Sequence, residues 1–97
     1  MPHYVILTNW TDQGIRAVKD SAARYDAFKD MVRQHGGREH SAFMTMGAYD
    51  LVVICELPSD EDMAQIALKL AAGGNVRTQT MKAFSEADYR RITAAIT

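Results

Sequence analysis

Hydrophobic residues gather in four short segments that are rich in β-branched and aromatic side chains. This composition is typical of β-strands, and polar or glycine-containing stretches separate the segments from one another. The predicted strands cover residues 3–10, 38–46, 49–57 and 75–84. Pro58 ends the third strand, because proline cannot donate a hydrogen bond to a neighbouring strand.

Between the predicted strands, apolar residues return at steps of three and four, which is the spacing of one helix face. They are Ile15, Val18, Ala22, Tyr25, Phe28 and Val32 in one segment, and Met63, Ile66, Ala67 and Leu70 in the next. Asp20 and Ser21 offer a second start inside the first segment, so we expect this helix to restart there. Ser59 and Ser85 are each followed three residues later by an aspartate, which predicts the starts of the next helix and of a short final helix. The final helix carries Tyr89, Ile92 and Ile96.

The resulting order is strand–helix–strand–strand–helix–strand, followed by the final helix. This is the order of the ferredoxin-like α+β fold. Right-handed crossovers place the four antiparallel strands in the order 4-1-3-2. At 97 residues, the chain is expected to form a single domain over residues 1–97.

The stretch MGAYDLVV, residues 46–53, joins the second and third strands. Gly47 followed by Ala48 is typical of a two-residue type II′ turn, which sets the pairing of the two strands and places Thr45 opposite Asp50 and Met44 opposite Leu51. Opposed residues share a face. The face expected under the helices collects Ala42, Met44, Met46, Tyr49, Leu51, Val53 and Cys55. The other face is mixed and collects Ser41, Phe43, Thr45, Asp50, Val52, Ile54 and Glu56.

Both faces of the predicted sheet therefore carry large apolar side chains, yet two helices can cover only one face. The first strand also carries large apolar side chains on both faces, namely Val5 and Leu7 on one and Tyr4, Ile6 and Trp10 on the other. Each large apolar side chain left in water forgoes roughly 1.5–3 kcal/mol. A second copy of the chain, packed sheet against sheet, is the simplest cover. We therefore expect a homodimer or a higher oligomer, with the mixed face as the wall of a shared, partly polar cavity.

Charge and cysteine content narrow the classes of partner. The chain has 11 Lys and Arg against 12 Asp and Glu, a net charge of -1, so neither nucleic acid nor an anionic membrane is an expected partner. Cys55 is the single cysteine, which excludes an internal disulfide and fits a reducing compartment. We find no signal peptide, no apolar run long enough to span a membrane and no cofactor-binding motif. We expect a soluble cytoplasmic protein without a cofactor.

Gly47, Tyr49 and Asp50 match the Gly-x-Tyr-Asp element for which the GYD-domain proteins, a family of small bacterial proteins, are named. The chain resembles this family also in the segments NWTDQG (9–14), GNVRT (74–78) and AFSEADY (83–89). The resemblance covers almost the whole chain and implies a ferredoxin-like domain that assembles as a dimeric α+β barrel. It implies no catalytic residues, since the family has no assigned activity. The hairpin is also similar to the effector-binding domain of AsnC-type regulators, which bind amino acids between subunits, but no DNA-binding segment precedes the first strand here.

Asp50 and Thr45 are the polar residues beside the predicted turn. The Asp50 carboxylate could hold an amine or hydroxyl of a ligand or act as a base. It could equally bond Thr45 or the turn backbone, as aspartates near turns often do. Tyr49 is expected to point toward the helices and to belong to the core.

Asn9, Trp10 and Arg77 are expected to be neighbours, at the opposite end of the sheet from Asp50. Together they could bind a carboxylate or a planar ligand, with Arg77 as a two-pronged donor. The alternative is a stack of Trp10 on Arg77 without a ligand.

No metal site is predicted. His3 and His40 lie on strands that are not neighbours in the expected order, so they should not share a metal ion. His40, Met44 and Cys55 share a face, which is only a weak indication of a soft-metal site. Cys55 is more simply a buried small hydrophobic residue.

Three functions remain open. The favoured one is a homodimeric small-molecule-binding module, with the ligand between or beside the sheets, because Thr45 and Asp50 place polar groups on an otherwise apolar face. The second is a small cofactor-free enzyme of the dimeric α+β barrel type, similar to monooxygenases or isomerases, for which fold analogy is the only support. The third is an interaction protein that docks on another chain.

Overall fold

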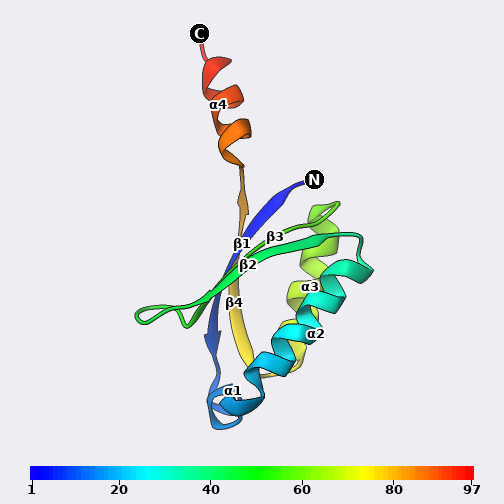
Figure 1. The fold of residues 1–97 in the computed structure, drawn as a ribbon, viewed down its shortest axis with the longest axis vertical. Coiled ribbons are helices and arrows are strands. Elements are labelled where there is room, and N and C mark those ends of the chain that lie inside the picture. Colours follow the sequence, from blue (N-terminus) through cyan, green and yellow to red (C-terminus); the bar gives the residue numbers. More distant parts are fainter.

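A computed structural model describes residues 1–97 and shows the predicted order of elements (Figure 1). The strands are β1 (His3–Trp10), β2 (Arg38–Met44), β3 (Leu51–Glu56) and β4 (Val76–Ala83). The helices are α1 (Asp12–Arg16), α2 (Ser21–Gln34), α3 (Asp60–Ala72) and α4 (Glu86–Ala94), with a short 3-10 helix, η1, at Val18–Asp20. The predicted restart is confirmed, since α2 begins at Ser21.

Side-chain oxygens cap the starts of three helices. The hydroxyl of Ser59 accepts from the backbone N–H of Asp62, and the hydroxyl of Ser85 accepts from that of Asp88. Both caps were predicted from the serine–aspartate spacing. Thr11 plays the same part for α1 by accepting from the N–H of Gly14. Each cap satisfies a backbone donor that the helix itself leaves free.

The four strands form one antiparallel sheet in the order β2-β3-β1-β4. This is the predicted order read from the other edge, and it confirms the ferredoxin-like α+β fold. In the register of β1 with β3, His3 lies opposite Glu56 and Thr8 lies opposite Leu51. The end of β1 therefore lies beside the start of β3, a relation that positions the candidate site.

Helices α2 and α3 cover one face of the sheet (Figure 1). Between them and the sheet lies the hydrophobic core, in which the side chains of Val32, Leu57 and Ile66 are fully buried. The other core residues are Tyr4, Ile6, Phe28, Val53, Cys55 and Met63. The predicted alternation is confirmed on β1 and on most of β3, where every second residue is buried.

The second face of the sheet, here called the open face, is covered by no helix of the chain (Figure 1). Its side chains, from the strand registers, are His3, Val5, Leu7, Asn9, Arg38, Ser41, Phe43, Val52, Ile54, Glu56, Arg77, Gln79, Met81 and Ala83. Phe43 is 59% exposed and Met81 is 43% exposed. The sequence predicted that one apolar face of the sheet would lack a covering helix, and the structure of the single chain confirms this.

The tip of the β2–β3 hairpin differs from the prediction. The strands end at Met44 and begin again at Leu51, so a wider loop replaces the predicted two-residue turn, and Gly47 takes a φ of 146°. The predicted pairing of Met44 with Leu51 is confirmed. The expectation that Met44 and Met46 lie under the helices is wrong, because the hairpin tip points away from α2 and α3 (Figure 1) and leaves Met44 71% and Met46 97% exposed.

Helix α4 projects from the end of β4 away from the rest of the molecule (Figure 1). None of its residues is buried. Tyr89 on this helix and Ile96, just beyond its end, are 61% and 75% exposed, so the apolar side chains of this segment have no partner within the chain.

Candidate functional site

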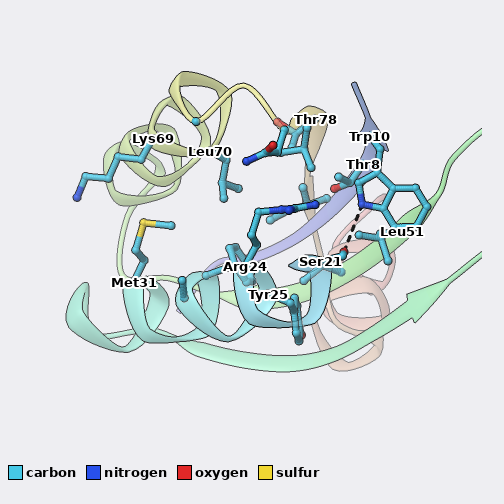
Figure 2. Close-up of a pocket in the computed structure, with 17 residues that line it drawn as sticks. Thr8, Trp10, Ser21, Arg24, Tyr25, Met31, Leu51, Lys69, Leu70 and Thr78 are labelled. Atoms are coloured by element: carbon cyan, nitrogen blue, oxygen red, sulfur yellow. Dashed lines mark hydrogen bonds between the residues drawn. The ribbon is translucent and has the colours of Figure 1, made fainter. Parts of the chain in front are cut away.

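A cavity of about 210 Å³ lies between the sheet and helices α2 and α3 (Figure 2). Ile6 and Val53 line it from the sheet, and Phe28, Met31 and Leu70 line it from the helices. Ten of its seventeen lining residues are hydrophobic. A mostly apolar cavity with a few polar groups is the usual form of a small-molecule site.

Arg24 is the charged side chain that reaches from α2 into this cavity (Figure 2). Its Nη1 donates to the carbonyl of Ala17 at 3.1 Å, and its Nη2 lies 3.4 Å from the carbonyl of Gly14. Both acceptors are neutral backbone groups, so the positive charge of the guanidinium is not cancelled by them. Arg24 can therefore attract the carboxylate or phosphate of a ligand whose apolar part fills the cavity.

Trp10 lines the same cavity from the end of β1, and its indole Nε1 donates to the Ser21 hydroxyl at 3.3 Å (Figure 2). Asn9 and Arg77 are paired between β1 and β4, as predicted, but on the open face. Trp10 pairs with Val76 instead. Because successive strand residues point to opposite faces, the predicted cluster of Asn9, Trp10 and Arg77 is split by the sheet, and the predicted Trp10–Arg77 stack is wrong.

Asp50 lies at the same end of the sheet as Trp10, not at the opposite end as predicted. Its carboxylate Oδ2 accepts from the backbone N–H of Trp10 at 3.0 Å, and its own N–H donates to the carbonyl of Thr8 at 2.9 Å. The physical reason is the antiparallel pairing of β1 and β3, which brings the end of one strand beside the start of the other. Asp50 thereby extends the β1–β3 pairing beyond the last strand residue.

Thr45 and Tyr49 hold the hairpin loop. The Thr45 hydroxyl donates to the carbonyl of Tyr49 at 2.5 Å, and its backbone N–H donates to the carbonyl of Asp50 at 2.8 Å. The Tyr49 hydroxyl donates to the side chain of Gln79, which lies on the open face, at 2.8 Å. The expectation that Tyr49 points toward the helices is therefore wrong, because Tyr49 lies in the widened loop and not in β3.

His3, His40 and Glu56 meet on the open face. The Nε2 atom of His3 lies 3.4 Å from Glu56 Oε1, His40 Nε2 lies 2.7 Å from Glu56 Oε2, and the two imidazole rings are stacked 5.6 Å apart. The expectation that the two histidines lie apart is wrong, because β3 lies between β1 and β2 and its Glu56 reaches both rings. Hydrogen bonding from His40, followed by the charges of the histidines and of Arg38, lowers the pKa of Glu56.

A bulge in β2 also changes the face that His40 occupies. The register shifts between Glu39 and Ser41, so His40 is an extra residue without a partner on β3. It joins Glu56 on the open face, whereas Cys55 is fully buried on the other face, so the predicted grouping of His40 with Met44 and Cys55 is wrong. Burial raises the pKa of the Cys55 thiol to about 11. This confirms Cys55 as a buried small hydrophobic residue without an activated thiolate.

The sequence did not indicate the cavity between sheet and helices. Of the predicted site residues, only Trp10 lines it; Asp50, Thr45, Asn9 and Arg77 lie outside. Arg24 falls within the helical segment whose apolar stripe is Tyr25, Phe28 and Val32. A charged residue beside an apolar stripe occurs on most amphipathic helices, so nothing in the sequence singled out Arg24.

None of the helices has the length and apolar character that crossing a membrane requires.

Among curated proteins, the chain is 30% identical over 89 residues to the "Glutamine synthetase and cystathionine beta-lyase binding protein" of Thermus thermophilus. The alignment covers 91% of this chain and 94% of that protein. Among solved structures it is similar to TTHA0845, also of Thermus thermophilus, with a TM-score of 0.53, 21% identity, and coverage of 88% and 95% of the two chains. It is also similar to FFRP-DM1, with a TM-score of 0.62, 21% identity, and coverage of 87% and 100%. The sequence model of the GYD domain matches residues 4–93, and the chain therefore belongs to the GYD domain family.

Proposed function

We propose that this protein is a homodimeric binding module that pairs through its open face and attaches to a metabolic enzyme. The observation that supports it most is the open face itself. Val5, Leu7, Val52 and Ile54 form its centre, between the exposed Phe43 on one side and the exposed Met81 on the other. A continuous apolar surface of this kind on a small protein marks an interaction site.

The size of the open face favours a second copy with help from α4. Eight residues at about 3.3 Å each and four strands about 4.8 Å apart give a face of roughly 26 by 19 Å, or about 500 Å². A stable interface usually buries about 800 Å² per partner. The apolar stripe of α4 continues from β4 and supplies further area, through Phe84, Tyr89, Ile92 and Ile96. In the proposed dimer each α4 packs on the other copy, and Asn9 and Arg77 lie at the interface.

The proposed enzyme partner comes from the curated relative, whose name is that of a protein binding glutamine synthetase and cystathionine β-lyase. The similarity to that relative extends over 91% of this chain, so it is not limited to one part of the domain. On this chain the hairpin tip is the suitable surface, since Met44 and Met46 are 71% and 97% exposed and project beyond the helices. Methionine adapts its shape to partner surfaces, which makes it frequent in binding sites.

The test is multi-angle light scattering of the purified chain alone and mixed with purified glutamine synthetase or cystathionine β-lyase of its source organism. We expect the protein by itself to be a dimer. We also expect it to form a complex with at least one of the two enzymes, and the number of copies of this chain in that complex to be even. The double variant Met44→Ser/Met46→Ser is expected to remain dimeric and to lose the complex. Leu68→Ser, at an exposed position on α3, is the matched control and should keep it. If the chain forms a complex with neither enzyme, the proposal is contradicted.

A second candidate function is supported by Arg24. The cavity that it enters is apolar and Arg24 has only backbone acceptors, which suits a small molecule with an apolar body and one anionic group. Thermal-shift screening of amino acids and other carboxylates tests this. We expect stabilisation by at least one of them that is lost in Arg24→Gln. A flat response over a broad set contradicts this candidate.

A further inference from the structure

The cluster of His3, His40 and Glu56 has the composition and geometry of a metal site, and neither the dimer nor the cavity accounts for it. One ligand atom from each residue can be chosen so that all three lie within 4.8 Å of one another. The two carboxylate oxygens of Glu56 each face one histidine, with Oε1 3.4 Å from His3 Nε2 and Oε2 2.7 Å from His40 Nε2. In a tetrahedral zinc site with bonds of about 2.0–2.1 Å, neighbouring ligand atoms are about 3.3 Å apart. The ligand atoms already lie within 4.8 Å of one another, so side-chain rotations can bring them to this spacing.

We propose that His3, His40 and Glu56 bind a divalent transition-metal ion of the zinc class. Two imidazole nitrogens and one carboxylate oxygen are ligands that suit Zn²⁺, Co²⁺ and Ni²⁺, whereas Mg²⁺ and Ca²⁺ prefer oxygen alone. Three protein ligands leave the fourth tetrahedral position for water or for a ligand. All three residues come from one chain, so the site does not depend on the proposed dimer.

The fold brings the three residues together in a specific way. His3 is at the start of β1 and lies opposite Glu56 at the end of β3, while β2 lies on the other side of β3. The β2 bulge then adds His40 on the same face. Bulges are a common means of directing a side chain to a functional site. A regular β2 strand would have no extra residue at this position.

The surroundings hold the ligands without sealing them. In a single chain the side chain of Glu56 is 14% exposed, and those of His3 and His40 are 25% and 33% exposed, so an ion can enter from solvent before two copies pair through the open face. Stacking of the two rings restricts their orientation. The Nε atom of Arg38 lies 3.5 Å from Glu56 Oε2. A carboxylate has about four lone-pair positions, so Glu56 can bind a metal ion while it keeps the ion pair with Arg38.

The competing explanation is a network in which Glu56 forms a hydrogen bond with His40 and ion pairs with His3 and Arg38, and no metal binds. The two explanations differ in what they predict for the loss of a ligand. If the cluster binds metal, His40→Ala and Glu56→Gln lower the affinity for Zn²⁺. Removal of the Arg38 charge then leaves the ligands in place, and Zn²⁺ binds at least as tightly. If the residues form only a salt-bridge network, none of the variants changes metal binding.

The test is calorimetric titration of Zn²⁺ into chelator-treated protein, together with the visible absorption of bound Co²⁺, which reports tetrahedral coordination. We expect one ion per chain, and a loss of affinity of at least 100-fold in His40→Ala and in Glu56→Gln, since changes merely adjacent to metal ligands already cost about 10–100-fold. Arg38→Ala is expected to keep the affinity. The matched control is His35→Ala, because His35 also bonds a carboxylate, that of Asp62 at 2.8 Å, but lies outside the cluster.

Circular dichroism of each variant confirms that it is folded, and His40 is exposed enough for its truncation to be tolerated. Equal Zn²⁺ affinity in the wild type, His40→Ala and Glu56→Gln overturns the proposal. So does the loss of binding in His35→Ala together with its retention in His40→Ala. Because the titration measures metal and not oligomeric state or enzyme binding, its failure is distinct from a failure of the proposed function.

Discussion

Replacing Asp50 by alanine should loosen the junction between the end of β1 and the hairpin. The pairing of β1 with β3 ends at Thr8 and Leu51, so no β3 carbonyl faces the N–H of Trp10. The Asp50 carboxylate fills that place, at 3.0 Å. Alanine leaves this partly buried donor without a protein partner, and a hydrogen bond to a charged group contributes about 1.5–3 kcal/mol. We therefore expect Asp50→Ala to lower the free energy of unfolding by about 2 kcal/mol.

For a chain of this length, a loss of about 2 kcal/mol lowers Tm by about 8–16 °C. Thermal and urea unfolding followed by circular dichroism, at one fixed protein concentration, measures the effect. Asp50→Asn keeps an acceptor oxygen without the charge and should lose less, about 0.5–1 kcal/mol. Asp26→Ala is the control, since the Asp26 side chain is 71% exposed and should stay within about 0.5 kcal/mol of wild type. A Tm of Asp50→Ala within about 2 °C of wild type refutes this role of Asp50.

Three further predictions concern packing and charge. Gly14→Ala places a Cβ 1.9 Å from a backbone carbonyl oxygen and should lower the free energy of unfolding by about 1–3 kcal/mol. Gly73→Ala is the control, because its Cβ has no contact under 3.5 Å and the free energy of unfolding should hardly change. Equal midpoints of urea unfolding for the two variants contradict this prediction. Ile66→Ala leaves a cavity at a fully buried position and should lower the free energy of urea unfolding by about 2–5 kcal/mol. Leu68→Ala, at an exposed position, should lower it by about 0.5 kcal/mol or less. A loss in Ile66→Ala as small as that in Leu68→Ala contradicts the burial of Ile66 in the core. The pKa of Glu56 is lowered from its usual 4.5, so the unfolded chain takes up its proton first as pH falls, and the stabilisation by Glu56 is present above pH 4.5 and lost below it. Glu56→Gln should therefore flatten the loss of stability between about pH 5 and about pH 3, and an unchanged slope argues against this ion pair.

The fold could be predicted from the sequence because its signals are local and agree with one another. Helix starts at Ser59 and Ser85 follow from a cap pattern of four residues, and the strand order follows from the handedness of the crossovers. The pairing of Met44 with Leu51 was predicted correctly even though the turn was not, since the alternation of apolar residues along the strands also specifies the register. Strand ends near the hairpin were less predictable, because nothing in the chain packs over the tip.

The candidate sites were harder to predict because they depend on relations between strands. Asp50 was assigned to the wrong end of the sheet, and only the antiparallel direction of β1 and β3 places it beside Trp10. His40 meets His3 through Glu56 on the strand between them and through a bulge that no residue in β2 signals. The cavity between sheet and helices depends on how closely α2 and α3 approach β1, which is a property of packing and not of periodicity.

The central claim, that two copies pair through the open face, is tested most directly by sedimentation equilibrium of the wild type and of Ile54→Lys. Ile54 lies at the centre of that face, and a lysine there places a charge in the proposed interface. We expect a wild-type dimer at about 10 µM and a folded monomer for Ile54→Lys, while Leu68→Lys on the opposite side remains a dimer. A wild-type chain that sediments as a monomer up to about 100 µM contradicts the claim.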